Sequence, residues 1–157
     1  MSKLSNIRTL KSSDLAKLKI VLDQTELFPS SILEQMANPF FNDSDCNEIW
    51  QVYEHNGDAV AFLYCVQEKL TEGTWNVLAI AVLPSVQNHG IGRLLMSNIE
   101  RVLQKNNQST LLVETSSLPE YDRTRKFYDH IGYHKEAVIR DFYAKGDHKV
   151  VFWKSLN

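Results

Sequence analysis

The sequence predicts a mixed α/β fold in which residues 1–157 form a single domain. The length supports one domain, because two separate cores in a chain of 157 residues would each be small. Segments rich in strand-forming residues alternate with segments whose apolar residues recur at helical spacing, and no linker rich in Pro, Gly or Ser separates them. The expected order of elements is β-α-α-βββ-α-β-α-ββ, which is typical of a mixed α/β domain.

The N-terminal half is expected to contain one short strand, two helices and three further strands. Residues 12–14 offer capping side chains to the first helix. The second helix is expected to start at a capping box formed by Ser31 and Glu34 and to end at Asn38-Pro39, and a loop over residues 40–47 follows. The strands of this half are expected at residues 7–10, 49–53, 59–66 and 74–83.

Turn signals and a long helix organise the rest of the chain. Asn56-Gly57 is a strong hairpin signal, since both residues tolerate a positive φ. The helix expected over residues 90–106 carries one apolar stripe at helical spacing. Gly132 closes a shorter helix over residues 121–130, and Lys145–Asp147 is expected to turn the final hairpin. The remaining strands are expected at residues 111–115, 133–143 and 148–154.

Composition excludes several classes of function. Seventeen basic and 19 acidic residues give a net charge of −2, which argues against a nucleic-acid-binding surface. Cys46 and Cys65 form no disulfide framework and have no metal-ligand spacing. His130 and His134 are four residues apart, but Gly132 ends the helix between them, so no metal is expected. No apolar run approaches the ~20 residues of a membrane span, so no membrane association is expected. We therefore expect a cytoplasmic protein with reduced thiols.

The most informative segment is Gln87–Arg93, where an apolar strand ends and the long helix begins. Gly90 and Gly92 let the backbone approach a ligand closely, and the free N–H groups of a first helical turn attract anions. Arg93 adds a cation within one turn. The segment lacks the Lys-Ser or Lys-Thr of a P-loop and the first glycine of a dinucleotide fingerprint. These residues indicate a phosphate or pyrophosphate site, although a plain strand-to-helix turn has the same spacing.

Two motifs at the right separation carry a resemblance to a known family. Gln87–Gly92 matches the Gln/Arg-x-x-Gly-x-Gly/Ala signature of the GNAT superfamily of N-acetyltransferases, between a strand and a helix as in that family. Phe127–Tyr133 resembles its Phe-Tyr-x-x-x-Gly-Phe/Tyr helix end, and Asp141–Asp147 resembles the final hairpin of many members. The resemblance covers residues 47–154. It implies a mixed central sheet of about six to seven strands, with a splay between strands 4 and 5.

The resemblance also implies that acetyl-coenzyme A is the co-substrate, held between the two splayed strands. Its pantetheine arm would bond the backbone of the strand over residues 74–83, and its pyrophosphate would accept hydrogen bonds from the Gly-rich segment. Tyr121 stands where many relatives have an Asn that helps to hold the cofactor, and it is still expected to contact the pantetheine or the adenine. The cofactor-binding residues implied are Ile80, Ala81, Val82, Gln87, Asn88, His89, Gly90, Ile91, Gly92, Arg93 and Tyr121.

Tyr128 matches the tyrosine that many relatives place near the thioester sulfur, where it would protonate the departing thiolate. A thiol ionises near pH ~8.5 and a phenol near ~10, so this transfer is about 2 kcal/mol uphill. Many relatives have a glutamate on the fourth strand as the base for the acceptor amine; that strand has none here, and Glu114 on the next strand is the candidate. The alternatives are that Tyr128 only packs and that Glu114 only forms a salt bridge.

In this family the acceptor enters opposite the cofactor, where aromatic and acidic residues would suit a cationic amine with an apolar body. We expect acetyl transfer to a primary amine of a small molecule or a protein, by direct attack in a ternary complex. A coenzyme A-binding regulatory module without turnover and an acyltransferase for longer acyl groups stay open. Dimers are common among relatives, and the sequence leaves a homodimer open. The acceptor-side residues implied are Phe28, Phe41, Asp43, Trp50 and Tyr143.

Overall fold

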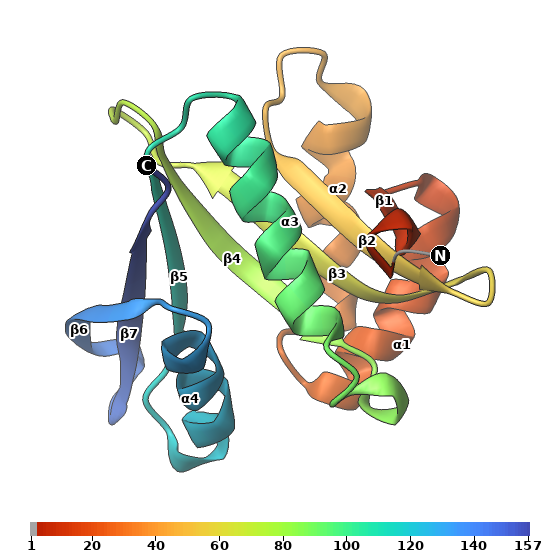
Figure 1. The fold of residues 1–157 in the computed structure, drawn as a ribbon. Coiled ribbons are helices and arrows are strands. Elements are labelled where there is room, and N and C mark those ends of the chain that lie inside the picture. Colours follow the sequence, from red (N-terminus) through yellow and green to blue (C-terminus); the bar gives the residue numbers. More distant parts are fainter. Residues whose placement is uncertain (1–2) are drawn as a thin grey trace. The chain divides into compact units, whose positions relative to one another are not determined.

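Figure 1 shows the fold as a computed structural model, which describes residues 3–157. Its elements follow the predicted order, so the mixed α/β fold is confirmed. Short 3-10 turns precede β1 and all four helices. The helices are α1 (Leu15–Thr25), α2 (Leu33–Asn42), α3 (Ile91–Lys105) and α4 (Asp122–His130). The strands are β1 (Ile7–Thr9), β2 (Ile49–His55), β3 (Asp58–Gln67), β4 (Thr74–Val82), β5 (Thr110–Ser116), β6 (His134–Ala144) and β7 (Asp147–Ser155).

The strands form one seven-stranded mixed sheet in the order β1-β2-β3-β4-β5-β7-β6. β1 pairs with β2, and β2 with β3, in antiparallel fashion. β4 and β5 are parallel, as expected when a helix connects two neighbouring strands. β7 is antiparallel to both of its neighbours, β5 and β6. The last strand of the chain is thus placed between β5 and β6.

β4 and β5 are paired over only part of their lengths. Their pairing covers four residue pairs and ends at Val77 and Val113. β4 nevertheless continues to Val82, and β5 continues to Ser116. This is the partial pairing predicted for a splay between strands 4 and 5.

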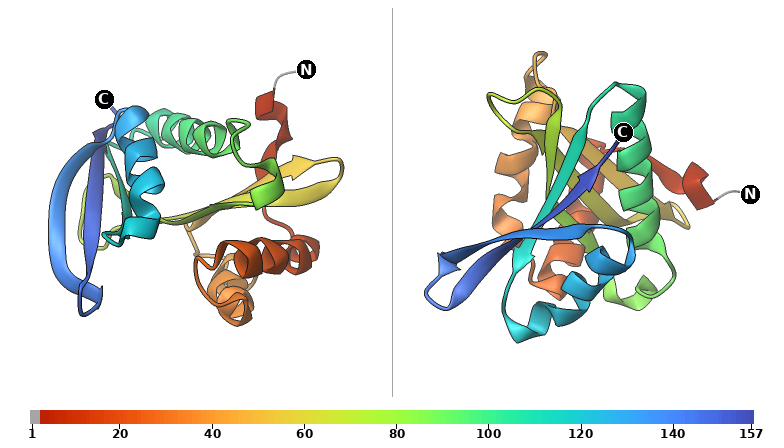
Figure 2. Two further views of the ribbon diagram at one scale, coloured as in Figure 1. Left: turned by 90° about the horizontal axis from the view of Figure 1, so that it is seen from below. Right: turned by 60° about the vertical axis from the view of Figure 1, so that its left-hand side comes forward.

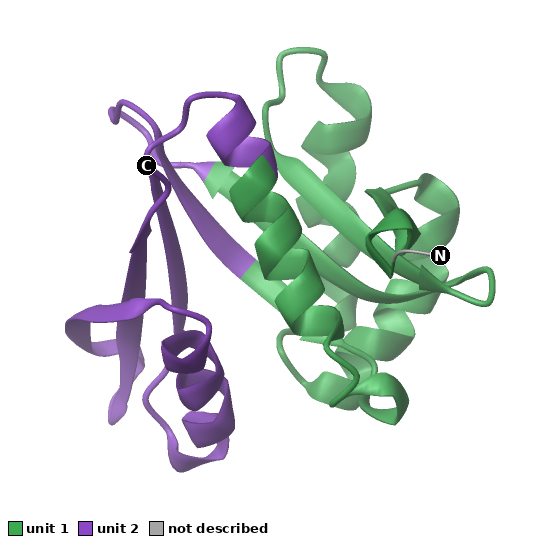
Figure 3. Cartoon of the chain, in the orientation of Figure 1, with its two compact units in different colours: residues 1–66, 79–101 green, residues 67–78, 102–157 purple. Residues whose placement is uncertain are grey.

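The chain divides into two compact units, shown in Figure 3, and β4 and α3 each contribute residues to both. The first unit consists of residues 1–66 and 79–101. In it, α3 covers one face of the strands, while α1 and α2 cover the other (Figure 2). The apolar core on the α1–α2 side draws on both helices and on β2, β3 and the end of β4. Its buried members include Leu18, Leu22, Leu33, Ala37, Trp50, Val52, Phe62, Ala79 and Ala81.

The second unit consists of residues 67–78 and 102–157. Leu111 and Val113 of β5 and Val150 and Phe152 of β7 are buried, at most 3% exposed. Alternate residues of each strand therefore share one apolar face, as the period of two requires. Tyr128 of α4 lies over that face, with its ring centroid 5.5 Å from that of Phe152.

The predicted end of the second helix is wrong. α2 continues through Pro39 to Asn42, so residues 40–42 are helical and the predicted loop is shorter than expected. A proline removes one helical donor, but its carbonyl still accepts, and Asp43 N–H donates to Pro39 O at 2.9 Å. The apolar stripe of Leu33 and Ala37 continues beyond the proline to Phe40, which packs against the same core. Burial of this stripe outweighs the lost hydrogen bond.

The capping box predicted at the start of α2 is also wrong, because α2 has no side-chain cap at its N-terminus. Glu34, expected in a capping box, instead accepts a hydrogen bond from Lys19 Nζ at 2.6 Å. Asp14 accepts two 2.8 Å bonds from Arg8 and one from Lys11 N–H. Asp14, one of the predicted capping side chains, thus caps the 3-10 turn that leads into α1, whereas the partner of Glu34 lies 15 residues away and is not revealed by local sequence patterns.

Candidate active site

The segment that follows β4 is shaped by its own hydrogen bonds. Leu83 N–H donates to Val60 O at 2.8 Å, which ties the end of β4 to β3. The Gln87 side chain turns back to the strand, with Nε2 donating to Val82 O at 3.0 Å. His89 Nδ1 lies 3.1 Å from the carbonyl oxygen three residues earlier. The Gln87 and His89 side chains therefore hold the loop.

The loop enters α3 through two residues in the left-handed region, Asn88 (φ 65°) and Gly90 (φ 79°). A Cβ at Gly90 would meet no atom within 4 Å, so the need for glycine there comes from the backbone conformation. Leu94 N–H donates to Gly90 O at 3.0 Å, which is the first helical bond of α3. The N–H groups of Ile91, Gly92 and Arg93 precede that bond and have no acceptor within the helix.

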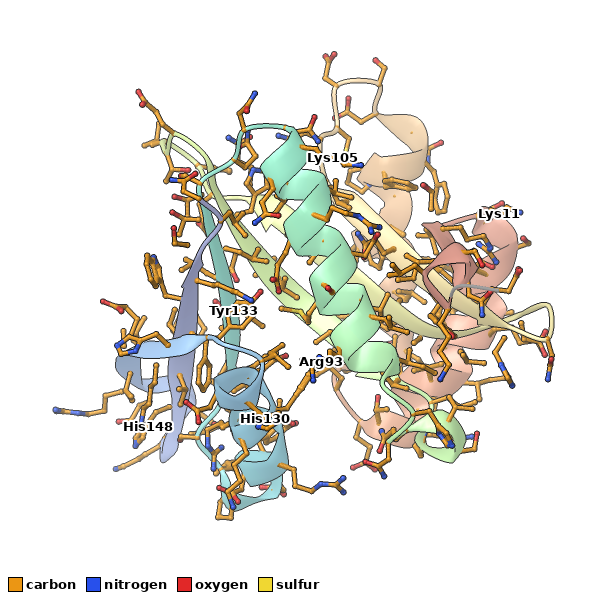
Figure 4. The ribbon with its side chains drawn as sticks, viewed as in Figure 1. Lys11, Arg93, Lys105, His130, Tyr133 and His148 are labelled. Atoms are coloured by element: carbon orange, nitrogen blue, oxygen red, sulfur yellow. The ribbon has the colours of Figure 1, made fainter. Side chains whose placement is uncertain are left out.

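Arg93 is exposed at the N-terminal end of α3, where Figure 4 labels it. Its guanidinium, the free N–H groups and the positive end of the helix dipole all favour an anion. Just upstream, Ile80, Ala81 and Val82 lie beyond the part of β4 that pairs with β5. Ala81 is buried in the apolar core. The strand end, the turn and the helix start together can hold an anionic group on backbone donors.

Tyr128 on α4 is buried, with 3% of its surface exposed. Its ring packs against Phe127, Tyr133 and Phe152, with centroid distances of 5.3, 6.2 and 5.5 Å. Burial raises the pKa of Tyr128 well above its ordinary value, and the field of Tyr143 adds to the rise. The phenol therefore stays protonated at neutral pH and can donate a proton or a hydrogen bond.

Tyr143 stands in a bulge of the final hairpin, because the register between β6 and β7 shifts after Ile139. Partial burial raises the pKa of Tyr143 to about 12, and the fields of Glu114, Asp147 and Tyr121 add to the rise. Tyr143 is 44% exposed, and Tyr121, just before α4, is half-buried. Within the second unit, Tyr143 thus lies within electrostatic range of each of the predicted residues Glu114, Tyr121 and Tyr128.

Glu114 is part of a polar network on the other face of β5. Its Oε2 accepts from Lys149 Nζ at 2.7 Å and from Asn76 Nδ2 at 3.1 Å. The side chains of Glu114 and Lys149 are only 13% and 15% exposed. Asn76 Nδ2 also donates to Glu68 Oε1 at 2.9 Å, and Lys149 Nζ lies 4.1 Å from the ring centroid of Phe142. Because both bonds to Glu114 use Oε2, Oε1 is the oxygen that can accept a further proton.

The acceptor-side residues of the first unit occupy different environments. Phe41 at the end of α2 is 37% exposed, and Asp43, which follows it, is exposed and accepts from Asp45 N–H at 2.9 Å. Phe28 is half-buried at the edge of the apolar core. Trp50 is 1% exposed and stacks on Tyr64 at 4.2 Å, so the structure places it in the core.

Sequence reasoning missed the partners of Glu114. Asn76 is a polar residue within the largely apolar strand β4, and that contrast is the one signal that could have drawn attention to it. Lys149 follows two polar residues at the start of β7 and gives no such signal. Arg125 Nη1 donates to the carbonyl oxygens of Ser116 (2.7 Å) and Leu118 (2.9 Å), so it holds the β5–α4 connection.

The described residues contain neither a helix that could span a membrane nor a cluster of metal-ligating side chains. Within residues 3–157, no helix is long and apolar enough to cross a membrane. In the same part of the chain, no three or more His, Cys, Asp or Glu side chains gather in a way that would hold a metal ion.

Known proteins share this fold along nearly the whole chain. A GNAT-family protein from Desulfovibrio desulfuricans superposes with a TM-score of 0.89 at 24% identity, over 96% of this chain and 98% of that one. The ribosomal-protein-S18-alanine N-acetyltransferase from Escherichia coli gives 0.77 at 19% identity, over 96% and 93%. An aminoglycoside 6'-N-acetyltransferase complexed with coenzyme A gives 0.77 at 16% identity, over 96% and 97%.

No curated protein matches the sequence. The family model described as "Acetyltransferase (GNAT) domain" matches residues 46–135, more than half of the chain and including the whole of the Gly-rich segment. The chain belongs to the GNAT acetyltransferase family.

Proposed function

We propose that this protein transfers an acetyl group from acetyl-coenzyme A to a primary amine by direct attack in a ternary complex. The observation that carries the proposal is the segment Gln87–Arg93, which follows the partly paired strand β4 and opens α3 with free N–H groups. In a GNAT-family chain, such a segment suits the pyrophosphate of the cofactor. The backbone of Ile80–Val82 would bond the pantetheine arm, and Tyr121 would contact the pantetheine or the adenine.

Exposed aromatic and acidic side chains and the known proteins of similar fold both bear on the class of acceptor. Phe41 and Asp43 of the first unit offer an exposed aromatic ring and a carboxylate, which suit a cationic amine with an apolar body. The similar structures include one enzyme named for a ribosomal-protein alanine and one named for aminoglycosides, so the fold accommodates both protein and small-molecule acceptors. A catalytically silent coenzyme A-binding module is the second candidate, because the Glu114 carboxylate is already bonded to Lys149.

Release of free thiol distinguishes an enzyme from a silent module. Purified protein with acetyl-coenzyme A and a panel of polyamines, aminoglycosides and N-terminal peptides is expected to release coenzyme A well above the rate without an amine. Millimolar coenzyme A is expected to raise the melting temperature, since ligand binding to the folded state stabilises it. Stabilisation without thiol release for any amine would favour the silent module. No stabilisation at all would contradict the cofactor site.

Replacement of Gly92 by aspartate tests the pyrophosphate site. A carboxylate in the first turn of α3 suits the helix dipole, so the fold should keep its stability, but it repels a phosphorylated ligand. Gly92→Asp is therefore expected to raise the Kd for coenzyme A about tenfold or more by calorimetry. Gly92→Asn, similar in size and uncharged, is the matched control and should weaken binding much less. Equal losses for both variants would indicate a steric effect and would count against the anion site.

Tyr128 is proposed as the general acid that protonates the thiolate of coenzyme A. Transfer from a phenol to a thiolate is about 2 kcal/mol uphill with ordinary pKa values. Burial raises the pKa of Tyr128 and increases this deficit. Tyr128 thus keeps its proton at neutral pH but is a weak acid. It donates this proton most readily when the sulfur gains negative charge in the same apolar surroundings.

Tyr128→Phe is expected to lower kcat about 10²-fold, a typical effect of a positioned acid, with little change in the KM for acetyl-coenzyme A. Because the pKa of Tyr128 is raised, its proton is retained to at least pH ~10, and the deficit should be constant between pH 7 and pH ~9. An acetyl thioester of a more acidic thiol should reduce the deficit. Tyr133→Phe, in the same aromatic cluster, is the control; a deficit independent of the leaving group would assign Tyr128 to packing.

Glu114 is proposed as the base that takes the proton of the acceptor amine through Oε1. A lysine-like amine with a pKa near ~10.4 needs about 4 to 5 kcal/mol to lose its proton at pH 7, which a positioned carboxylate can partly supply. Lys149 and Asn76 keep this carboxylate in place on β5, with both bonds on Oε2.

Glu114→Gln is expected to lower kcat/KM about 10²-fold at pH 7, and the loss should shrink towards pH ~10, where the free amine forms without a base. Lys149→Met keeps the carboxylate and removes its cation, so it should destabilise the fold yet retain most of the activity of the folded enzyme. If both variants lose the same activity at every pH, Glu114 serves only the ion pair.

A further inference from the structure

A wide bulge of β6 lies opposite the single residue His148 of β7, which Figure 4 labels. The register of the two strands leaves four residues of β6, 140–143, between the pairs that flank His148. Phe142 and Tyr143 belong to this bulge and are 51% and 44% exposed. A bulge interrupts the ladder of backbone hydrogen bonds, so its N–H and C=O groups need other partners. Whatever holds the bulge therefore decides where its two aromatic rings lie.

The imidazole of His148 provides one of these partners. Asp141 N–H donates to His148 Nδ1 at 2.9 Å. Because Nδ1 accepts this bond, it carries no proton, and the proton of the neutral ring is on Nε2. Asp141 Oδ1 lies 3.5 Å from the same ring nitrogen and accepts instead from Gly146 N–H at 2.8 Å. Asp141 is thus held through its backbone by His148 and through its side chain by the hairpin turn.

The backbone of Asp141 has a conformation that needs such support. Its φ of 53° lies in the left-handed region, which is unfavourable for residues other than glycine. A residue keeps this conformation only where the surrounding contacts compensate for it. The N–H group of this same residue is the donor to His148. Loss of the acceptor at Nδ1 would therefore remove a contact on which the conformation of the bulge depends.

His148 can hold the bulge because its own backbone is fixed on the other side. Its N–H donates to Ser117 Oγ at 2.8 Å, and its carbonyl oxygen accepts from Ser117 N–H at 2.9 Å. The preceding residue, Asp147, accepts a hydrogen bond from Ser116 Oγ. These bonds join the start of β7 to the end of β5 and the connection that follows it. The ring of His148 therefore extends from an anchored strand towards the bulge.

The bulge carries its aromatic rings to the proposed base and its cation. The Phe142 ring centroid lies 4.1 Å from Lys149 Nζ, and Lys149 Nζ lies 2.7 Å from Glu114 Oε2. The rings of Phe142 and Tyr143 meet edge to face, with centroids 5.1 Å apart. Tyr143 also lies within electrostatic range of Glu114. A shift of the bulge would therefore move two rings that lie beside the Glu114–Lys149 pair.

We infer that His148 is a positioning residue: its neutral imidazole holds the β6 bulge through Nδ1 and so keeps Phe142 and Tyr143 beside the Glu114–Lys149 pair. The use of this arrangement for the acceptor amine rests on the proposed function, whereas the hold of His148 on the bulge does not. Position 148 then requires an acceptor atom at the place of Nδ1. Asparagine supplies one in its Oδ1, and leucine, of similar size, does not.

Hydrogen exchange of the Asp141 amide tests the bond without any ligand. His148→Leu is expected to speed the exchange of this amide about tenfold by NMR, and His148→Asn should keep it within about threefold of the wild type. His134→Leu removes an exposed histidine from β6 outside the bulge and should leave the exchange unchanged. Circular dichroism verifies that the variants are folded. Unchanged exchange in His148→Leu, or equally fast exchange in His148→Asn, would overturn the inference.

The tautomer of His148 gives a second test in the unaltered protein. At pH ~8, where a free imidazole is neutral, nitrogen-15 NMR distinguishes a protonated from an unprotonated ring nitrogen. The signals of His148, assigned by their loss in His148→Asn, are expected to show an unprotonated Nδ1. A protonated Nδ1 would overturn the inference, whether or not His148→Leu folds.

Kinetics test the consequence for acetyl transfer, with spermidine, kanamycin and a peptide with an N-terminal alanine as probes. His148→Leu is expected to raise the KM for the accepted amine about tenfold and to change the Kd for coenzyme A less than about twofold, because Tyr143 is expected on the acceptor side. His148→Asn should restore the KM. Faster amide exchange with an unchanged KM would overturn the positioning role. No turnover with any probe would contradict the proposed function, and the exchange result would still decide whether His148 holds the bulge.

Discussion

The proposed pantetheine site depends on how far β4 and β5 stay paired. The N-terminal part of β4 is bonded to β5 up to Val77, and the C-terminal part carries Ala79 and Ala81 into the apolar core of the first unit. A strand that continues beyond its pairing has backbone N–H and C=O groups along one edge that need partners. An amide-containing ligand such as the pantetheine arm supplies such partners, which is the physical reason for proposing that Ile80–Val82 bind it.

The negative net charge of the chain is compatible with its negatively charged proposed ligand, because backbone N–H groups would bind that ligand. A net charge of −2 argues against an extended anionic partner, but a single pyrophosphate needs few cations when backbone N–H groups do most of the binding. Gln87 and His89 use their side chains to hold the loop, so the site depends on conformation more than on side-chain identity. Such a site can be recognised from two glycines at a helix start, long before its geometry is known.

Local patterns predicted most of the fold. The apolar stripe of α3, the Asn56-Gly57 turn and the glycine at 132 each specify their element through neighbours a few residues away, and all three were confirmed. The end of α2 was missed because burial of Phe40 against the core decides whether a helix tolerates Pro39. The Glu114–Lys149 pair was also missed as a pair, since the two residues are brought together by the β5–β7 register and not by sequence proximity.

The two proposed catalytic groups of the second unit illustrate opposite uses of burial. Tyr128 is neutral when protonated, so burial among Phe127, Tyr133 and Phe152 keeps the proton on it and makes it a dependable, weak acid. Glu114 acts as a base only when it is charged, and the ammonium of Lys149 lies 2.7 Å from its Oε2 in surroundings that are only 13% exposed. Tyr128 of α4 thus packs in an apolar cluster on one face of β5 and β7, whereas Glu114 belongs to a polar network on the other face. The proposed base thus shares its carboxylate with Lys149, and an arriving amine would compete with that ammonium for it.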